Sequence, residues 1–210
     1  MEIAIPLYER FTALDAVGPY EVLSRLPGAR VRFIAAEIGP LRTENGMLAL
    51  SADARLQDVP EPDIIVVPGG LGTRALLEDE QLLGWIRHAH KHSQWTTSVC
   101  TGSLLLGAAG VLRGLAATSH WLALDLLEQF DAQPVPERVV MQGKVITAGG
   151  VSAGIDMALT LAAQIAGDDV ARAIQLGIEY APEPPFDAGC TRTAPEHIVA
   201  LVRGATAQFA

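Results

Sequence analysis

Cys100 is the residue with the strongest chemical character in the sequence. It follows the β-branched residues Thr96, Thr97 and Val99 and precedes the apolar run Leu104–Leu106, so we expect it at the junction of a buried strand and a helix. A thiol at that junction faces the first free N–H groups of the helix, and these donors, with the helix dipole, favour the nucleophilic thiolate. The alternative is a small buried core residue, a common role for free cysteine.

Other polar and glycine residues also fall where strands are expected to end. In open α/β sheets, functional sites lie outside the carboxyl ends of the strands. The residues at such positions are Asp15, Gly69, Gly70, His120, Gly149 and Gly150. Asp15 is flanked by apolar Leu14 and Ala16, and burial there would raise its pKa until it holds a proton near neutrality. An ordinary helix N-cap is the alternative for Asp15.

The glycines after the strand that ends at Val67 allow two interpretations. Gly70–Ala75 matches G-x-G-x-x-A, a dinucleotide-binding pattern, but no acidic residue ends the next strand, where Cys100 stands instead. We favour the other interpretation, in which the backbone N–H groups of Gly70 and Thr101 form an oxyanion-type hole. Gly150 and His120 are the further candidates for contacting a substrate.

Three histidines and a second cysteine have weaker claims to chemistry. His88, His90 and His92 follow one another at alternate positions of a predicted amphipathic helix, where only His88 and His92 share a face. No carboxylate or cysteine stands beside them in the sequence, so we interpret them as a solvated helix face and expect no metal site. Cys190 lies in a proline-rich tail, and we expect no catalytic role for it.

Composition narrows the class of protein. A chain of 210 residues, half of them apolar, suits one large α/β domain. The net charge of -9 leaves no basic surface for nucleic acid. Two cysteines make no disulfide framework, the first residues do not resemble a signal peptide, and no apolar run approaches the ~18 residues of a membrane span. We therefore expect a cytoplasmic protein that binds neither nucleic acid nor membrane.

The order of the predicted elements indicates a doubly wound, mostly parallel sheet with helices on both faces. We predict strands at 3–8, 31–36, 63–68, 95–99, 116–120, 138–142 and 144–148, with a hairpin within 40–58. We predict helices at 13–26, 73–93, 101–110, 121–130 and 153–166. Residues 180–189 are too rich in proline for helix or strand and should run extended. We predict a last helix from about Pro195. We expect this tail and helix to pack on the surface of the single domain 1–210 or on a partner.

The motifs around Cys100 resemble those of the ThiJ/PfpI superfamily. They are Ser98–Gly102, with Val67–Gly70 upstream and Thr118–Trp121 downstream. Within the superfamily, four stretches are most similar to the bacterial isonitrile (isocyanide) hydratases: Leu14–Pro19, Ser98–Gly110, Gly149–Thr160 and Glu179–Phe186.

The resemblance implies a flavodoxin-like fold, a homodimer and a cofactor-independent enzyme. By matching position, it makes Cys100 the nucleophile, Asp15 the carboxyl group beside its sulfur, and Thr101 the source of an N–H and a hydroxyl near the thiolate. The implied reaction is hydration of an isocyanide to an N-substituted formamide through a cysteine thioimidate. Ser119, Val151 and the early end of the chain depart from the hydratase pattern and bear on substrate preference.

Other functions remain open at this point. The same cysteine would serve a glyoxalase- or deglycase-like enzyme acting on small α-oxoaldehydes. Related domains also act as ligand-sensing modules that precede DNA-binding segments in some regulators. A protease is less favoured, because no third partner for a cysteine and a histidine is identifiable.

Overall fold

A computed structural model describes residues 1–207, which fall into two compact units. The first, Met1–Ile178, contains every strand. The second begins at Glu179 and contains one helix, α6 (Glu196–Ala207).

A seven-stranded sheet forms the centre of the first unit, with the strand order β10-β11-β7-β6-β1-β2-β5. Every neighbouring pair is parallel except β10 and β11. The strands are β1 (Glu2–Pro6), β2 (Arg30–Ala35), β5 (Ala54–Arg55), β6 (Ile64–Val67), β7 (Trp95–Val99), β10 (Val139–Gln142) and β11 (Val145–Ala148). This architecture confirms the predicted flavodoxin-like, mostly parallel α/β fold.

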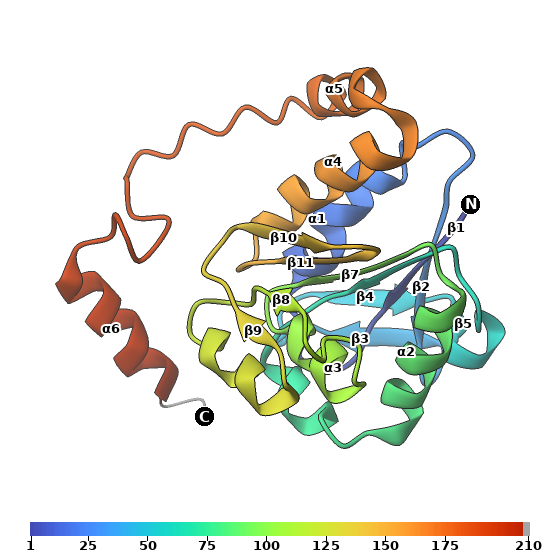
Figure 1. Ribbon diagram of the computed structural model, residues 1–210, viewed down its shortest axis with the longest axis horizontal. Coiled ribbons are helices and arrows are strands. Elements are labelled where there is room, and N and C mark those ends of the chain that lie inside the picture. Colours follow the sequence, from blue (N-terminus) through green and yellow to red (C-terminus); the bar gives the residue numbers. More distant parts are fainter. Residues whose placement is uncertain (208–210) are drawn as a thin grey trace. The chain divides into compact units, whose positions relative to one another are not determined.

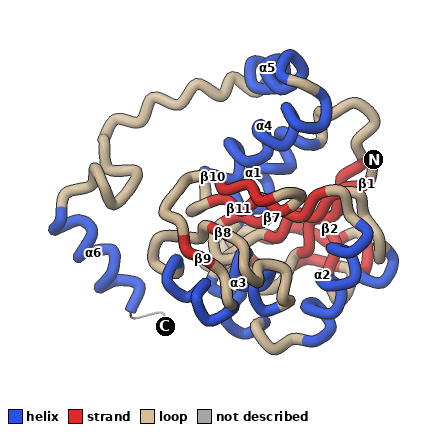
Figure 2. The backbone as a smooth tube through the Cα atoms, in the orientation of Figure 1, coloured by secondary structure: helices blue, strands red, loops and turns tan. Residues whose placement is uncertain are grey.

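Helices cover both faces of this sheet (Figures 1 and 2). Figure 1 shows α1 (Ala13–Leu23) and α4 (Ala153–Ala166) on one side, and α2 (Glu80–His92) and α3 (Gly102–Ala108) on the other. Helix α5 (Asp168–Gly177) packs on α4. Coverage on both sides explains why the central strand β6 reads Ile-Ile-Val-Val without alternation and has no exposed side chain.

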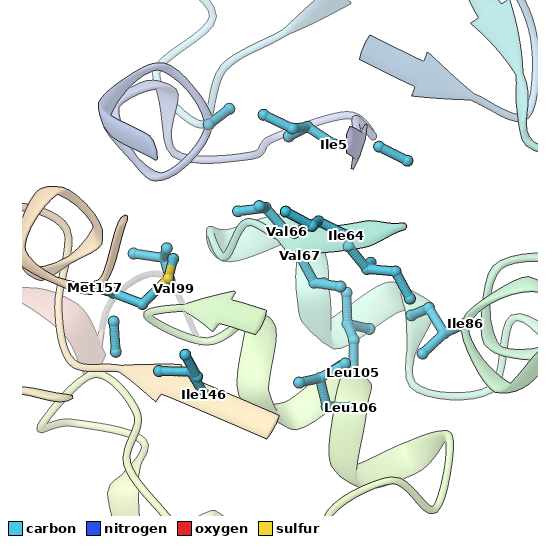
Figure 3. Packing of buried hydrophobic residues seen from close by; sticks show 14 of the residues in the cluster. Ile5, Ile64, Val66, Val67, Ile86, Val99, Leu105, Leu106, Ile146 and Met157 are labelled. Carbon is cyan, nitrogen blue, oxygen red and sulfur yellow. The ribbon is translucent and has the colours of Figure 1, made fainter. Parts of the chain in front are cut away.

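The hydrophobic core fills the spaces between the sheet and its helices (Figure 3). Ile5 and Ile64 come from the central strands, Leu105 from α3 and Met157 from α4, and all four are fully buried. Cys100 belongs to the same cluster, so the candidate nucleophile stands at the margin of a packed interior.

The hairpin expected within 40–58 is present as β3 (Gly39–Arg42) and β4 (Ala49–Ala52). Several other small elements differ from the sequence prediction. The strand expected at 116–120 is reduced to β8 (Ala116–Ala117), which pairs with β9 (Gln133–Pro134) outside the main sheet. The helix expected at 121–130 is a 3-10 helix over Leu124–Phe130, and a separate 3-10 helix, Leu71–Leu76, occupies the start of the helix expected at 73–93. Helix α2 begins only at Glu80, because the Asp79 carboxylate caps it by accepting a hydrogen bond from Leu82 N–H at 2.9 Å.

The chain from 180 to 195 contains neither helix nor strand, which confirms the effect of its prolines. Helix α6 follows, close to its predicted start. Its packing on a domain or partner stays a prediction. Within residues 1–207, no helix is both long enough and apolar enough to cross a membrane.

Candidate active site

Cys100 lies at a tightly held turn between β7 and α3. Its φ of 57° is left-handed, a conformation that costs free energy for any residue with a Cβ atom. Its N–H donates to the carbonyl groups of Ala148 and Gly149 at 3.1 and 3.0 Å, and its carbonyl accepts from the hydroxyls of Ser103 and Ser119, both at 3.1 Å. These bonds hold the strained residue in place from both sides, and the residue is only 5% exposed.

Close backbone contact explains the glycines around the turn. A Cβ atom at Gly102 would lie 2.2 Å from the Val67 carbonyl oxygen, and one at Gly69 would lie 2.5 Å from the Thr101 nitrogen. The start of α3 therefore packs directly against the end of β6.

Asp15 is fully buried in the first turn of α1. The N-cap of that helix is Thr12, so the alternative interpretation of Asp15 as an N-cap is wrong. Asp15 Oδ2 accepts a hydrogen bond from Gly69 N–H at 2.9 Å, whereas Oδ1 receives none from an N–H or O–H group. The Cys100 thiol lies close enough to this carboxyl group to influence its pKa.

Burial raises the pKa of Asp15 to about 7. The hydrogen bond from Gly69 opposes this shift, the charge of Glu44 adds to it, and the hydrogen bond with Cys100 opposes it. The expectation of an aspartic acid that holds a proton near neutrality is thus confirmed.

The pKa of Cys100 is raised by burial and, next, by the negative charge of Asp15. The backbone N–H groups of Thr101 and Val151 and the Thr101 side chain lower it, but they do not outweigh burial. The expectation that helix donors alone would favour a resting thiolate is therefore wrong. The thiol and the carboxyl group form a coupled pair that shares one proton above about pH 7.

Thr101 links the turn after β7 to the turn after β6. Gly70 N–H donates to Thr101 Oγ1 at 2.9 Å, and the hydroxyl lies 3.2 Å from the Gly70 carbonyl. Since its N–H is already bound, Gly70 cannot supply the oxyanion contact that the sequence suggested. The N–H groups that lower the pKa of Cys100 are instead those of Thr101 and Val151.

The glycine-rich turn after β6 is closed against its own chain. A Cβ at Gly70 would lie 2.5 Å from the Arg10 carbonyl oxygen, and one at Gly72 would lie 2.0 Å from that of Glu9. This packing occupies the backbone that a pyrophosphate would approach, so the dinucleotide pattern here is a structural turn.

His120 lies against Gly150, as chain order suggested. A Cβ at Gly150 would lie only 2.7 Å from His120 Cδ2. His120 Nδ1 accepts a hydrogen bond from Leu122 N–H at 3.3 Å, and burial lowers the pKa of the ring. His120 is therefore a neutral imidazole with its proton on Nε2, beside the loop that carries Val151. A contact with substrate stays a prediction for both His120 and Gly150.

Three further residues act on the pair or lie beside it but were not candidate site residues in the sequence. Tyr8 donates its hydroxyl to the Pro68 carbonyl at 2.6 Å, and burial, followed by the charges of Asp15 and Cys100, raises its pKa. Exposed Glu44 accepts a hydrogen bond from Thr12 at 3.0 Å and also acts on Asp15 and His120. Val151 has a left-handed φ of 36°. The sequence placed Tyr8 at the end of the first strand and showed Val151 only as a departure from the hydratase pattern, while no sequence pattern indicated Glu44.

Comparisons with known proteins bear on what this arrangement is for. The chain is 46% identical to an isonitrile hydratase from Pseudomonas putida over 199 residues, which cover 95% of this chain and 87% of that protein. It is 29% identical over 173 residues to the HTH-type transcriptional regulator CdhR from Pseudomonas aeruginosa. That match covers 80% of this chain but only 51% of the regulator.

Solved structures and a family model identify the family of the chain. A ThiJ/PfpI family protein from Pseudomonas syringae superposes with a TM-score of 0.95 at 37% identity, covering 99% of this chain and 86% of the other. Oxidized DJ-1 from Toxoplasma gondii shares the fold, with a TM-score of 0.76 at 22% identity over 86% of this chain and 99% of its own. The model of the DJ-1/PfpI family matches residues 1–164. The chain belongs to the DJ-1/PfpI family.

Proposed function

We propose that this protein is an isonitrile hydratase, a lyase that converts an isocyanide and water into an N-substituted formamide with Cys100 as nucleophile. The observation that carries the proposal is the buried pair formed by the Cys100 thiol and the Asp15 carboxyl group, which lies in a chain 46% identical to an isonitrile hydratase. The pair supplies both things that an isocyanide carbon needs, a nucleophile and a proton.

The first step uses only the pair and the substrate. The sulfur forms a bond to the terminal isocyanide carbon, and Asp15 delivers the shared proton to that same carbon. The product is a thioimidate, Cys100–S–CH=N–R, which contains every atom of the isocyanide and the thiol. Asp15 is left as a carboxylate, so it can serve as a base in the next step.

The second step consumes one water molecule. Water attacks the thioimidate carbon while the Asp15 carboxylate accepts a proton, and the C=N electron pair moves to nitrogen. The C–S bond then breaks, and the sulfur leaves with its electron pair. One water proton ends on nitrogen and the other returns to the Cys100–Asp15 pair, so the enzyme is restored as the formamide leaves.

The backbone donors support the departure of the sulfur. The Thr101 and Val151 N–H groups lower the pKa of Cys100, so they favour negative charge on its sulfur. Negative charge that develops on sulfur as the C–S bond breaks is therefore stabilised by donors already in position. No resident cofactor or metal takes part in this scheme.

The test is a comparison of substrate classes with one purified preparation. We expect an alkyl isocyanide to yield its formamide with saturable kinetics, and methylglyoxal to be turned over far more slowly. Turnover of methylglyoxal without turnover of isocyanides would instead assign a glyoxalase-type activity.

A ligand-sensing role is the second candidate, and the match to part of a transcriptional regulator favours it. Saturable isocyanide binding without formamide release would support that role and contradict the proposed enzyme. We also propose a homodimer, to be tested by light scattering coupled to gel filtration.

A further inference from the structure

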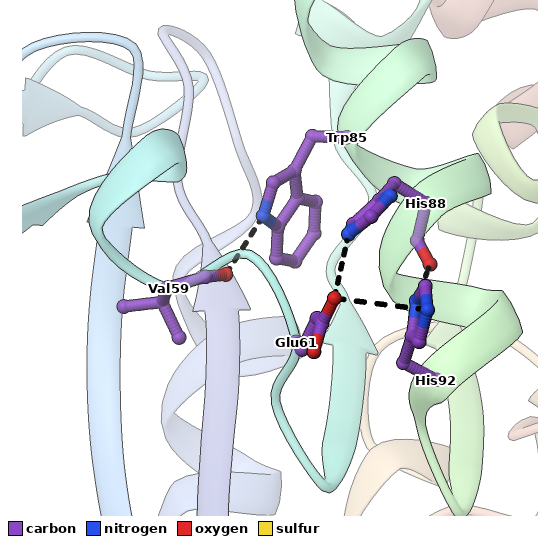
Figure 4. A network of polar contacts seen from close by, with 5 residues as sticks. All are labelled: Val59, Glu61, Trp85, His88 and His92. Atoms are coloured by element: carbon purple, nitrogen blue, oxygen red, sulfur yellow. Dashed lines mark hydrogen bonds and ion pairs between the residues drawn. The ribbon is translucent and has the colours of Figure 1, made fainter.

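A second group of chemically active side chains lies outside the candidate active site. Glu61 stands in the loop that enters β6, and His88 and His92 occupy the last turns of α2 (Figure 4). We call these three residues the α2 histidine cluster. They lie at the amino-terminal side of β6, whereas Cys100 follows the carboxyl end of the neighbouring parallel strand, β7.

The three ligand atoms of the α2 histidine cluster converge. Glu61 Oε1 lies 3.1 Å from His88 Nε2 and 3.6 Å from His92 Nε2, and all three atoms are within 4.8 Å of one another. Ligands bound at about 2.0–2.2 Å to one transition-metal ion are separated by roughly 3.0–3.5 Å from each other. The two separations from Glu61 Oε1 lie in or close to this range, so small side-chain adjustments would let the three atoms share one ion.

The hydrogen bonding of His92 supplies a second, independent observation. Its Nδ1 lies 2.9 Å from the His88 carbonyl oxygen, which can only accept, so Nδ1 carries the ring proton. Nε2 is therefore the ring nitrogen that faces the Glu61 carboxylate. An Nδ1–H bonded to a backbone carbonyl is the usual arrangement behind a histidine that ligates a metal through Nε2.

A buried contact holds the loop that carries the carboxylate in place. Trp85, on the same helix, donates its indole N–H to the Val59 carbonyl at 2.9 Å, which fixes the loop to α2 (Figure 4). Pro60 and Pro62 flank Glu61 and restrict its backbone. The sequence interpretation of a solvated face missed this carboxylate, because Glu61 precedes His88 by 27 residues.

We propose that the α2 histidine cluster binds a divalent late first-row transition metal ion of the zinc class. Two imidazoles and one carboxylate form a ligand set that suits Zn²⁺, Co²⁺ and Ni²⁺ better than Ca²⁺ or Mg²⁺. The position at the carboxyl end of α2 also favours a cation through the helix dipole. All three side chains are about half exposed, so an ion can enter directly and water can complete its coordination.

The test is calorimetric titration of untagged protein with Zn²⁺ in a Cys190→Ser background, which removes the exposed thiol. We expect one saturable site per chain, and at least ~10-fold weaker binding after His92→Gln or Glu61→Gln. Zn²⁺ should also raise the melting temperature of the parent but not of these variants, and EDTA should reverse the rise.

His90→Gln is the matched control. His90 lies on the same helix, but its Nδ1 is 2.9 Å from Thr96 Oγ1 and it does not belong to the α2 histidine cluster. This variant should keep parental affinity. Absence of saturable binding by the parent, equal affinity in the His92→Gln variant, or a loss confined to His90→Gln would each overturn the proposal.

Discussion

At the scale of single residues, the proposed chemistry depends on one proton held between Cys100 and Asp15. Burial disfavours a negative charge on either group, and each charge disfavours the other. In an exposed pair the proton at neutral pH would stay on sulfur, whereas burial raises the pKa of Asp15 to about 7, so the carboxyl group can also hold a proton near neutrality. Backbone donors from Thr101 and Val151 then stabilise the sulfur during the steps in which it is charged.

Substitutions at Asp15 test the proton transfer. Asp15→Asn preserves size and the hydrogen bond from Gly69, but it cannot deliver an acidic proton, so formamide production should fall by ~10²-fold or more. Asp15→Glu moves the proton by one methylene group and should retain partial activity. Steady-state rates, with circular dichroism to verify folding, measure both effects. Near-normal turnover by folded Asp15→Asn would leave Asp15 with a structural role only.

The pH profile tests the shared proton separately. Below about pH 7 both groups are protonated, so the thiol is neutral and the carboxyl group cannot accept its proton. We expect kcat/KM to rise as the pH increases through about 7 and then to level off, because a singly protonated pair is the reactive form. The profile should be recorded from pH 5 to 9 for wild type and Asp15→Asn. A flat wild-type profile, or the same inflection in the variant, would contradict the assignment.

At the scale of elements, the site is an assembly of strand ends, and much of it could be predicted from sequence. The apolar runs that form β6 and the β-branched run in β7 identified the central strands, and polar residues after them identified the edge with the chemistry. Conformation at the turns could not be predicted, because the left-handed φ of Cys100 depends on hydrogen bonds to a distant segment, the end of β11. The hydrogen bond from Gly70 N–H to Thr101 Oγ1 could not be predicted either, because it depends on the contact between the turns after β6 and β7.

The contact between α3 and β6 can be tested through stability. A methyl group at Gly102 would collide with the Val67 carbonyl at 2.2 Å, so Gly102→Ala should destabilise the fold by about 1–3 kcal/mol or more. Gly84→Ala in α2 is the control, since its nearest neighbour is Arg87 Nη2 at 3.8 Å and alanine favours the helix by about 0.8–1 kcal/mol. Urea denaturation should separate the two variants. Equal stability would mean that α3 does not need this close approach.

At the scale of the whole molecule, composition and element order predicted the class of fold, while pairings across long sequence distances stayed hidden. Glu44 meets Thr12 across 32 residues, and Glu61 meets His88 across 27. Both carboxylates come from loops without a periodic pattern, so only the folded chain identifies their neighbours. The family membership now rests on 164 matched residues and on close structural similarity, and it agrees with the motif resemblance.

The central claim, covalent hydration of isocyanides by Cys100, is tested most directly by formamide production in two single-cysteine variants. Cys100→Ala removes one sulfur from a site built largely of backbone, so the fold should persist while turnover falls below a detectable level. Cys190→Ser changes an exposed residue and should retain wild-type turnover. Substantial residual turnover by folded Cys100→Ala, or an equal loss in both variants, would contradict the claim.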